Sequence, residues 1–233
     1  MPTWIVTGAS RGLGRHLAAQ MAARGWTVIA CARDAGALKQ LADAHPSGRI
    51  RAVAVDLANA GDLRSALIAA LADVGFVDGL VNNAGIGAYK PFLDHSEAEL
   101  LQTLQVNLGA VMQLTHIVLP GMIERRAGHI VNIGSDLGRR PLANMAAYVA
   151  AKHGLTGFSH SLLREVKQHG VKVSLVNPGI IDTDFGGATE GSKDEAWSLR
   201  PAVLANLILQ IIDQPGATTV DELSVHPLGQ GDF

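Results

Sequence analysis

The chain has 233 residues, a formal net charge of -2 at pH 7, 48% hydrophobic and 17% charged residues, 26 glycines and one cysteine. This composition excludes intrinsic disorder, a basic nucleic-acid-binding surface and a disulfide framework, and the length allows one large domain. Because the N-terminus has no basic segment followed by an apolar stretch, and no apolar run approaches the roughly 18 residues of a membrane span, we expect a cytoplasmic protein with no membrane partner.

Short β-branched runs alternate with longer helical patterns along the chain. The predicted strands are Trp4–Thr7, Thr27–Cys31, Ile50–Val55, Gly79–Val81, His129–Ile133, Val171–Val176 and Glu222–Val225. The predicted helices are Leu13–Arg24, Ala35–Ala44, Asn59–Ala72, Glu97–Arg125, Met145–His169 and Pro201–Asp213. Most strands are apolar almost throughout, which is typical of a parallel sheet covered by helices on both faces. We therefore expect a single doubly wound α/β domain over residues 1–233.

Glycines are concentrated where predicted strands lead into helices. They are Gly8, Gly12 and Gly14 after the first strand, Gly85 and Gly87 after the fourth, Gly134 and Gly138 after the fifth, and Gly179, Gly186 and Gly187 after the sixth. These positions share the carboxyl-end edge of the sheet, where open α/β folds bind ligands.

The segment from Thr7 to Gly14 (TGASRGLG) directly follows the first strand. Its three glycines permit positive φ and let backbone amides approach an anion, and the helix that begins near Leu13 adds free N–H groups. We expect a pyrophosphate here, although the glycine spacing differs from the usual G-x-G-x-x-G, and a tight connection without a ligand is the alternative.

The same segment also matches G-x-S-x-G around Ser10, the nucleophile elbow of serine hydrolases. That fold needs several strands and an oxyanion-hole loop before the elbow, whereas only seven residues precede Gly8. We therefore set the hydrolase hypothesis aside.

Arg33 stands after the second strand, about 20 residues beyond Gly14, where NAD-binding folds usually carry an acid. Its guanidinium and that of Arg11 could clamp a 2′-phosphate through bidentate hydrogen bonds. We expect NADP(H) to be preferred over NAD(H). The alternative is a solvated Arg33 paired locally with Asp34.

Tyr148 and Lys152 are four residues apart on a predicted helix and so lie on one face. A nearby ammonium favours the phenolate, so we expect Lys152 to lower the pKa of Tyr148. Ser135 follows the fifth strand on the glycine-rich edge, where its hydroxyl could hold a substrate oxygen beside Tyr148.

Taken in order, these motifs resemble the classical short-chain dehydrogenase/reductase family from Thr3 to about Val225. The matching pieces are the Thr7–Gly14 loop, Asp56-Leu57, Asn82-Asn83-Ala84-Gly85, Asn107, Ser135, Tyr148 with Lys152, and Pro178-Gly179 with Thr183. The resemblance implies a Rossmann-type parallel sheet of about seven strands and an NADP(H)-dependent carbonyl reductase, reversible as an alcohol dehydrogenase. It also implies a homodimer or homotetramer, with dimers formed through the helices that contain Asn107 and Tyr148.

The resemblance further implies a catalytic tetrad of Asn107, Ser135, Tyr148 and Lys152. It assigns Asp56 to the adenine ring, Asn82 to the wall beside the cofactor and Thr183 to the nicotinamide carboxamide. The full set of expected cofactor contacts is Gly8, Ser10, Arg11, Gly12, Leu13, Gly14, Arg33, Asp56, Leu57, Asn82, Ala84, Gly85, Tyr148, Lys152, Pro178, Gly179, Ile181 and Thr183.

The candidate substrate-binding residues lie in the segment 184–199 and at Asp136. Residues 184–199 should form a short lid, with Phe185 and Trp197 as candidate anchors, unless these two side chains only cap the final helix. Asp136 either lines the substrate pocket, where its charge would disfavour anionic substrates, or is a solvated turn residue. The nine histidines show no metal-ligand spacing, so we expect no metal.

The substrate is a small-molecule carbonyl compound or alcohol under this hypothesis. A 3-oxoacyl compound, a small aldehyde or ketone, and a pteridine all remain open. The alternative function is a non-catalytic NADP(H)-sensing regulator on the same fold, which would have no need of Ser135, Tyr148 and Lys152 together.

Overall fold

The structure, a computed structural model, describes residues 1–45, 48–72 and 74–231. Seven parallel strands form one sheet in the order β3-β2-β1-β4-β5-β6-β7. Their bounds are β1 Thr3–Thr7, β2 Thr27–Ala32, β3 Ile50–Ala54, β4 Gly79–Asn82, β5 Gly128–Ile133, β6 Val171–Pro178 and β7 Glu222–Val225. The expected Rossmann-type sheet is confirmed.

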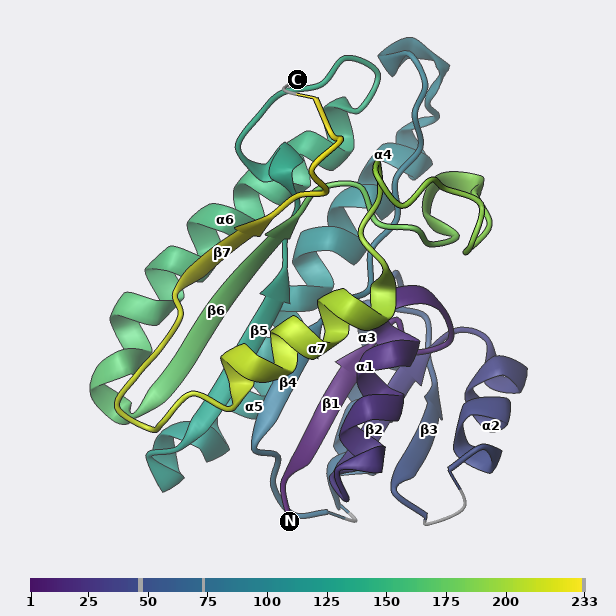
Figure 1. The fold of residues 1–233 in the computed structure, drawn as a ribbon. Helices are drawn as coiled ribbons and strands as arrows, with labels where there is room; N and C mark the ends of the chain where they lie inside the picture. Colours follow the sequence, from purple (N-terminus) through teal and green to yellow (C-terminus); the bar gives the residue numbers. More distant parts are fainter. Residues whose placement is uncertain (46–47, 73, 232–233) are drawn as a thin grey trace.

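Helices cover both faces of the sheet (Figure 1). They are α1 Gly12–Ala23, α2 Ala35–Asp43, α3 Ala60–Ala72, α4 Glu97–Leu104, α5 Ala110–Arg125, α6 Ala146–Val166 and α7 Pro201–Ile212. Buried side chains of α1, α2 and α7 share one core cluster, and those of α3, α5 and α6 share a second. The fold therefore has three layers, with the sheet in the middle.

Alternation along each strand divides its side chains between these two cores. In β1, Trp4 and Val6 belong to the first cluster, whereas Ile5 belongs to the second. In β2, Val28 and Ile29 divide in the same way. Because successive side chains point to opposite faces and both faces are covered, these strands are apolar almost throughout.

The predicted helix Glu97–Arg125 is interrupted in the structure by a π-helical turn at Gln105–Gly109. Its start is capped by Ser96 and Glu99, whose side chains each bond the other residue's backbone N–H. Contrary to expectation, the whole run is long and apolar enough to cross a membrane by length and composition. Leu114 and Met122 of this run nevertheless pack in the second core.

The order of the strands determines where a ligand can bind at the edge of the sheet. The chain leaves β1 towards β2 and later returns to the other side of β1 as β4, so a crevice opens beyond the carboxyl ends of β1 and β4. The segments after these strands nearly touch: a Cβ added to Gly8 would lie 2.9 Å from the Cα of Ala84.

Substitution of Gly79 tests how closely β1 and β4 pack at the Trp4 ring. A Cβ there would lie 2.2 Å from the buried ring of Trp4, its partner across the β1–β4 pair. Gly79→Ala should therefore lower the free energy of unfolding by about 1–3 kcal/mol, measured by urea denaturation. Gly157→Ala is the control because no atom lies within 4 Å of its Cβ position in α6, so stability should be unchanged or raised by about 0.5–1 kcal/mol. Equal losses in both variants would contradict this packing.

Candidate active site

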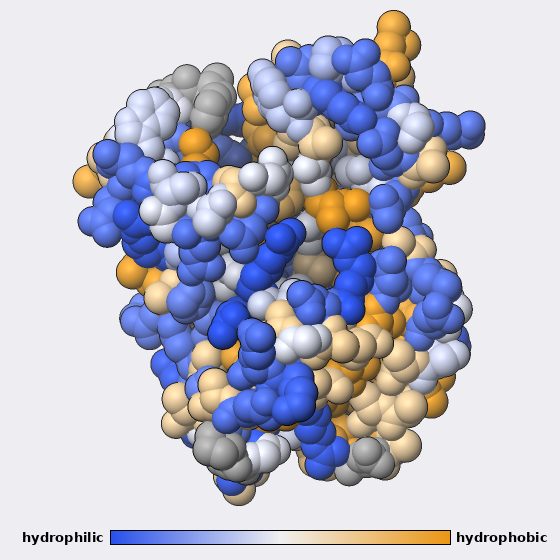
Figure 2. Space-filling view, turned by 90° about the vertical axis from the view of Figure 1, so that its right-hand side faces the viewer, coloured by the Kyte–Doolittle hydropathy of each residue, from blue (hydrophilic) through white to orange (hydrophobic). Residues whose placement is uncertain are grey.

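A cleft of about 670 Å³ lies at the carboxyl ends of the strands. It is lined by residues at and beyond the carboxyl ends of β1 to β6, and by Asp184, Phe185 and Lys193 of the segment 184–199 that the sequence predicts to be a lid. The hollow in the middle of the side shown in Figure 2 has both hydrophilic and hydrophobic residues around it. Such mixed walls suit a ligand that combines charged groups with flat apolar rings.

Most of the residues that the sequence singles out line this cleft. They are Gly8, Ser10, Arg11, Gly12, Leu13, Arg33, Asp56, Leu57, Ala84, Gly85, Ser135, Asp136, Tyr148, Lys152, Pro178, Gly179, Ile181, Thr183 and Phe185. Four others do not line it, namely Gly14, Asn82, Asn107 and Trp197.

The loop after β1 has the conformation that an anion cradle needs. Gly8 and Gly12 adopt φ of 66° and 51°, in the region that favours glycine. Gly14 lies inside α1, where a Cβ would come within 2.3 Å of the carbonyl oxygen of Gly8. Gly14 therefore allows the loop to fold tightly against its own helix, and it is Gly8 and Gly12 that border the cleft.

The wall beside β4 is formed by Asn83 instead of the expected Asn82. Asn82 is buried, and its Nδ2 donates to Oδ1 of Asn132 at 2.8 Å across the sheet. Asn83 lines the cleft, and its Nδ2 donates to the carbonyl oxygen of Thr7 at 2.8 Å. The two residues differ because neighbouring positions at a strand end point to opposite sides.

Two guanidinium groups border the cleft beyond β1 and β2. Arg11 and Arg33 are exposed, and no ion-pair partner for either occurs in the part of the chain that the structure describes. The carboxylate of Asp34 instead accepts from the N–H of Ala37 at 2.9 Å and caps α2. The alternative of an Arg33–Asp34 pair is therefore not what the structure shows.

Lys152 is buried beneath the cleft on α6. Its Nζ donates to the carbonyl oxygen of Ile133 at 2.7 Å and lies 5.5 Å from the ring centroid of Tyr148. Burial lowers the pKa of Lys152 to about 8, because a low-dielectric site disfavours the charged form.

The pKa of Tyr148 is shifted in the direction opposite to the one expected. Burial, supported by the negative charge of Asp136, raises its pKa to about 12, and the hydrogen bond with Ser135 offsets this only in part. The expected lowering by Lys152 is not found, because desolvation is the stronger effect. The phenol is thus held in its protonated form at neutral pH.

Ser135 and Asp136 start the short 3-10 turn Asp136–Gly138 after β5. The Oγ of Ser135 donates to Oδ1 of Asp136 at 3.1 Å and accepts from the N–H of Leu137 at 3.2 Å. The other carboxylate oxygen of Asp136 accepts from Nε2 of Gln230 at 2.9 Å. Asp136 therefore lines the cleft, and both of its carboxylate oxygens accept hydrogen bonds.

Asn107 lies behind the wall, in the π-helical turn. Its Nδ2 donates to the carbonyl oxygens of Ile86 at 2.7 Å and Thr103 at 2.8 Å. A Cβ on Gly85 would lie 2.8 Å from Oδ1 of Asn107 and 3.9 Å from Nζ of Lys152. Asn107 and Lys152 thus approach the same glycine, and π-turns of this kind are frequent at functional sites.

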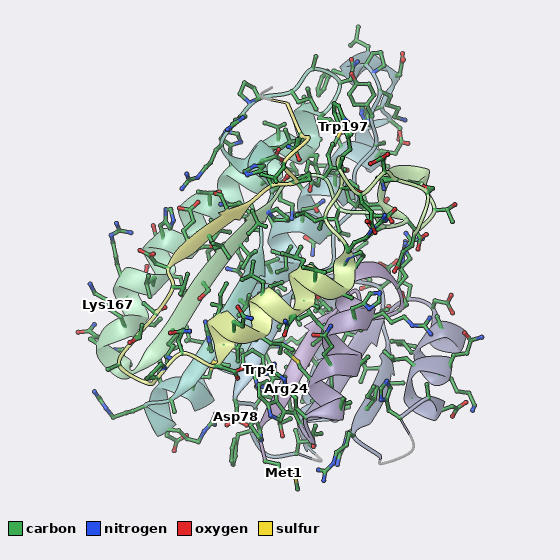
Figure 3. The ribbon with its side chains drawn as sticks, in the orientation of Figure 1. Met1, Trp4, Arg24, Asp78, Lys167 and Trp197 are labelled. Atoms are coloured by element: carbon green, nitrogen blue, oxygen red, sulfur yellow. The ribbon has the colours of Figure 1, made fainter. Side chains whose placement is uncertain are left out.

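The two expected lid anchors are not equivalent. Phe185 lines the cleft, with its ring centroid 5.5 Å from that of Tyr148. Trp197, which is labelled in Figure 3, is 54% exposed and does not line the cleft. The base of the segment 184–199 is held by the buried carboxylate of Asp182, which accepts from the N–H of Gly191 at 2.9 Å and pairs with Arg200.

Sequence reasoning missed several residues of the site. The unpredicted lining residues include Asn83, Ile86, Val106, Met145, Ile180 and Lys193, and Gln230 stands behind Asp136. Most of them adjoin a motif residue in sequence, which is a usable signal. Lys193 and Gln230 have no such neighbour. Within the described residues, no cluster of histidine, cysteine, aspartate or glutamate could hold a metal ion.

Comparisons with known proteins identify the family. Residues 2–194 match the family model described as short chain dehydrogenase. The chain is 38% identical over 181 residues to the 3-oxoacyl-(acyl-carrier-protein) reductase FabG of Salmonella typhimurium, covering 78% of this chain and 74% of the relative.

Two solved structures are similar over nearly their whole length. The alcohol dehydrogenase of the archaeon Thermococcus sibiricus, complexed with 5-hydroxy-NADP, superposes with a TM-score of 0.93 at 26% identity, covering 100% of this chain and 99% of that one. A metagenomic short-chain oxidoreductase in complex with NADP superposes with a TM-score of 0.84 at 33% identity, covering 97% of each chain.

The buried ammonium of Lys152 should reduce stability at neutral pH. Its pKa of about 8 in the folded chain is below the unfolded value, so the cost is full below pH 8 and disappears as pH rises towards about 10.5. Lys152→Met should therefore raise the free energy of unfolding at pH 7 by up to about 3 kcal/mol, less the lost hydrogen bond to Ile133. Urea denaturation at pH 7 and pH 10 measures the difference. A gain that grows with pH would contradict the buried cation.

Proposed function

This chain belongs to the short-chain dehydrogenase family of oxidoreductases, and on that premise we propose that it reduces a small-molecule carbonyl compound with NADPH, reversibly. The observation that carries the proposal is the meeting of Ser135, Tyr148 and Lys152 in one cleft below the glycine-rich loop. A regulator that only senses the cofactor would not need these three groups together.

A bound nicotinamide would supply the hydride for reduction and accept it in oxidation. Ser135 and Tyr148 donate hydrogen bonds to the carbonyl oxygen, where negative charge develops, and each such donor is worth about 3–4 kcal/mol in the transition state. For this, the Ser135 hydroxyl must turn from Asp136 towards the substrate. Tyr148 then transfers its proton to that oxygen, and its pKa of about 12 keeps the proton available at pH 7.

Lys152 stabilises the phenolate that this transfer leaves behind. It is buried within 5.5 Å of the Tyr148 ring, so its positive charge acts in a low-dielectric site. Its ammonium also binds the ribose next to the nicotinamide. Asn107, which reaches Gly85 from behind, anchors a water that links Lys152 to solvent.

The rest of the cleft fits a dinucleotide. The cradle of Gly8 and Gly12 at the N-terminus of α1 holds the pyrophosphate, and the exposed guanidinium groups of Arg11 and Arg33 hold a 2′-phosphate. Asp56 and Leu57 border the adenine, and Thr183 meets the carboxamide. Similar chains with NADP bound support this assignment.

The substrate binds between Tyr148, Phe185 and Asp136. The carboxylate of Asp136 disfavours an anionic group next to the reacting carbonyl. Similarity to a 3-oxoacyl-carrier reductase makes 3-oxo esters the first compounds to examine, followed by small aldehydes and ketones. We place the enzyme in the cytoplasm as a homodimer or homotetramer, in which exposed Leu101 and Met112 of α4 and α5 meet a second copy.

Replacement of Tyr148 by phenylalanine tests the chemistry. Tyr148→Phe removes the proton donor while keeping the ring against Phe185, so kcat for carbonyl reduction should fall roughly a thousandfold and the Kd of NADPH should change less than about twofold. Tyr89→Phe is the control, because Tyr89 is exposed and lies outside the cleft lining. Turnover is followed as NADPH oxidation against a carbonyl panel. Full turnover by Tyr148→Phe would refute the mechanism.

Replacement of Arg33 tests the cofactor preference. Arg33→Asp removes a cation from the 2′-phosphate and offers an acceptor to a ribose hydroxyl, so the ratio of kcat/KM for NADPH to that for NADH should fall roughly a hundredfold. Arg64→Asp, an exposed change on α3 outside the cleft lining, should leave the ratio unchanged. If the ratio is equally unchanged in Arg33→Asp, another residue reads the phosphate.

A further inference from the structure

We propose that Lys193, in the lid, supplies the cation that binds the diphosphate of the dinucleotide. The inference rests on the proposed function, and no motif in the sequence marks this residue. It follows from where the ammonium lies, how its backbone is held, and which charged group of the ligand lacks a cationic partner.

The ammonium of Lys193 lies next to the glycine-rich loop. Lys193 lines the cleft, and its Nζ donates to the carbonyl oxygen of Thr183 at 2.9 Å. The side chain of Thr183 in turn lies 3.0 Å from the position of a Cβ on Gly12. Lys193, Thr183 and Gly12 therefore follow one another along the part of the cleft where the diphosphate binds.

The backbone of Lys193 is anchored on both sides. Its N–H donates to Oδ1 of Asp182 at 3.2 Å, and its carbonyl oxygen accepts from Nη1 of Arg200 at 3.3 Å. Asp182 is only 1% exposed, so this anchor belongs to the interior of the protein. When a ligand binds the ammonium, the backbone of Lys193 is therefore already ordered, and this reduces the entropy cost of binding.

The ammonium also has donors to spare. It carries three N–H groups, and in the described part of the chain it donates one hydrogen bond, to Thr183. The nearby carboxylate of Asp182 attracts its charge. The oxygens of that carboxylate, however, already accept from the N–H groups of Gly191 and Lys193 and from Arg200.

The lid also passes over the start of α1 (Figure 1). His16, in the first turns of that helix, pairs with Glu190 of the lid at 2.9 Å. Lys193 is three residues further along the same segment. The lid is thus held beside the helix N-terminus whose free N–H groups face the diphosphate.

The charges of the cleft can now be matched with those of the ligand. Its cationic side chains are Arg11, Arg33, Lys152 and Lys193. The first two belong to the 2′-phosphate and the third to the ribose beside the nicotinamide, under the proposed function. The diphosphate is then left without a cationic side chain unless Lys193 binds it.

This role differs from that of Arg33 in a measurable way. NADPH and NADH carry the same diphosphate and differ only at the 2′ position. Loss of Lys193 should therefore weaken both cofactors equally, whereas loss of Arg33 should weaken NADPH alone. Adenosine 2′-monophosphate, which has no diphosphate, should be insensitive to Lys193.

The test is the Kd of NADPH, NADH and adenosine 2′-monophosphate, measured by ligand fluorescence, or by competition for the last. Lys193→Gln should raise the Kd of both dinucleotides roughly tenfold, the value of one charge-assisted hydrogen bond, and leave that of the monophosphate unchanged. It should also flatten the dependence of Kd on salt, because a screened charge pair has been lost. Lys193→Arg should bind both dinucleotides within about threefold of the natural chain. Lys167→Gln, at the far end of α6 (Figure 3), is the matched control.

The outcomes separate the two claims. If the natural chain binds neither dinucleotide, the proposed function fails. If it binds them and Lys193→Gln changes neither Kd, the role of Lys193 is refuted while the function stands. A purely structural role would also overturn the inference. In that case Lys193→Gln and Lys193→Arg would raise the Kd of the dinucleotides alike, or the Kd of the monophosphate would rise as well, and the salt dependence of Kd would be unaltered.

Discussion

The site depends on the hydrogen bonds that join the ends of β1 and β4. The Oγ1 of Thr7 accepts from the N–H groups of Asn83 and Ala84, each at 3.0 Å, and donates to the carbonyl oxygen of Val81 at 3.3 Å. The side chain of Asn83 returns a bond to the carbonyl oxygen of Thr7. Thr7 is 1% exposed, so these bonds are shielded from water and hold the mouth of the crevice at one width.

That width explains why small residues surround the cleft. With β1 and β4 held together, any side chain at Gly8 would meet Ala84, and any at Gly14 would meet the carbonyl oxygen of Gly8. Backbone N–H groups can therefore come close to an anion. The same closeness lets Asn107 and Lys152 reach Gly85 from below. A single clamp between two strands thus determines both the phosphate end and the catalytic end.

The electrostatics of the site follow from burial. The phenol of Tyr148 and the ammonium of Lys152 are both driven towards their neutral forms, with pKa values of about 12 and about 8. A carbonyl oxygen from β5 orients the ammonium in place of a carboxylate. The protein accepts a cost in stability for this arrangement, which leaves a proton on the tyrosine and a positive charge close by.

The sequence alone determined the sheet, the glycine loop and the Tyr148–Lys152 pair, because each depends on a local rule. Buried parallel strands are apolar almost throughout, phosphate turns need glycine, and residues four apart share a helix face. The direction of the side chain at the end of β4 determined that Asn83, and not Asn82, lines the cleft. Burial reversed the expected shift of the Tyr148 pKa. Only the tertiary structure placed Lys193 beside Thr183, and Gln230 behind Asp136, 94 residues earlier in the chain. The Gln230–Asp136 contact arises where loops from different strands meet at one edge of the sheet, and the Lys193–Thr183 contact lies within the single segment between β6 and α7. No local period or spacing encodes either of them.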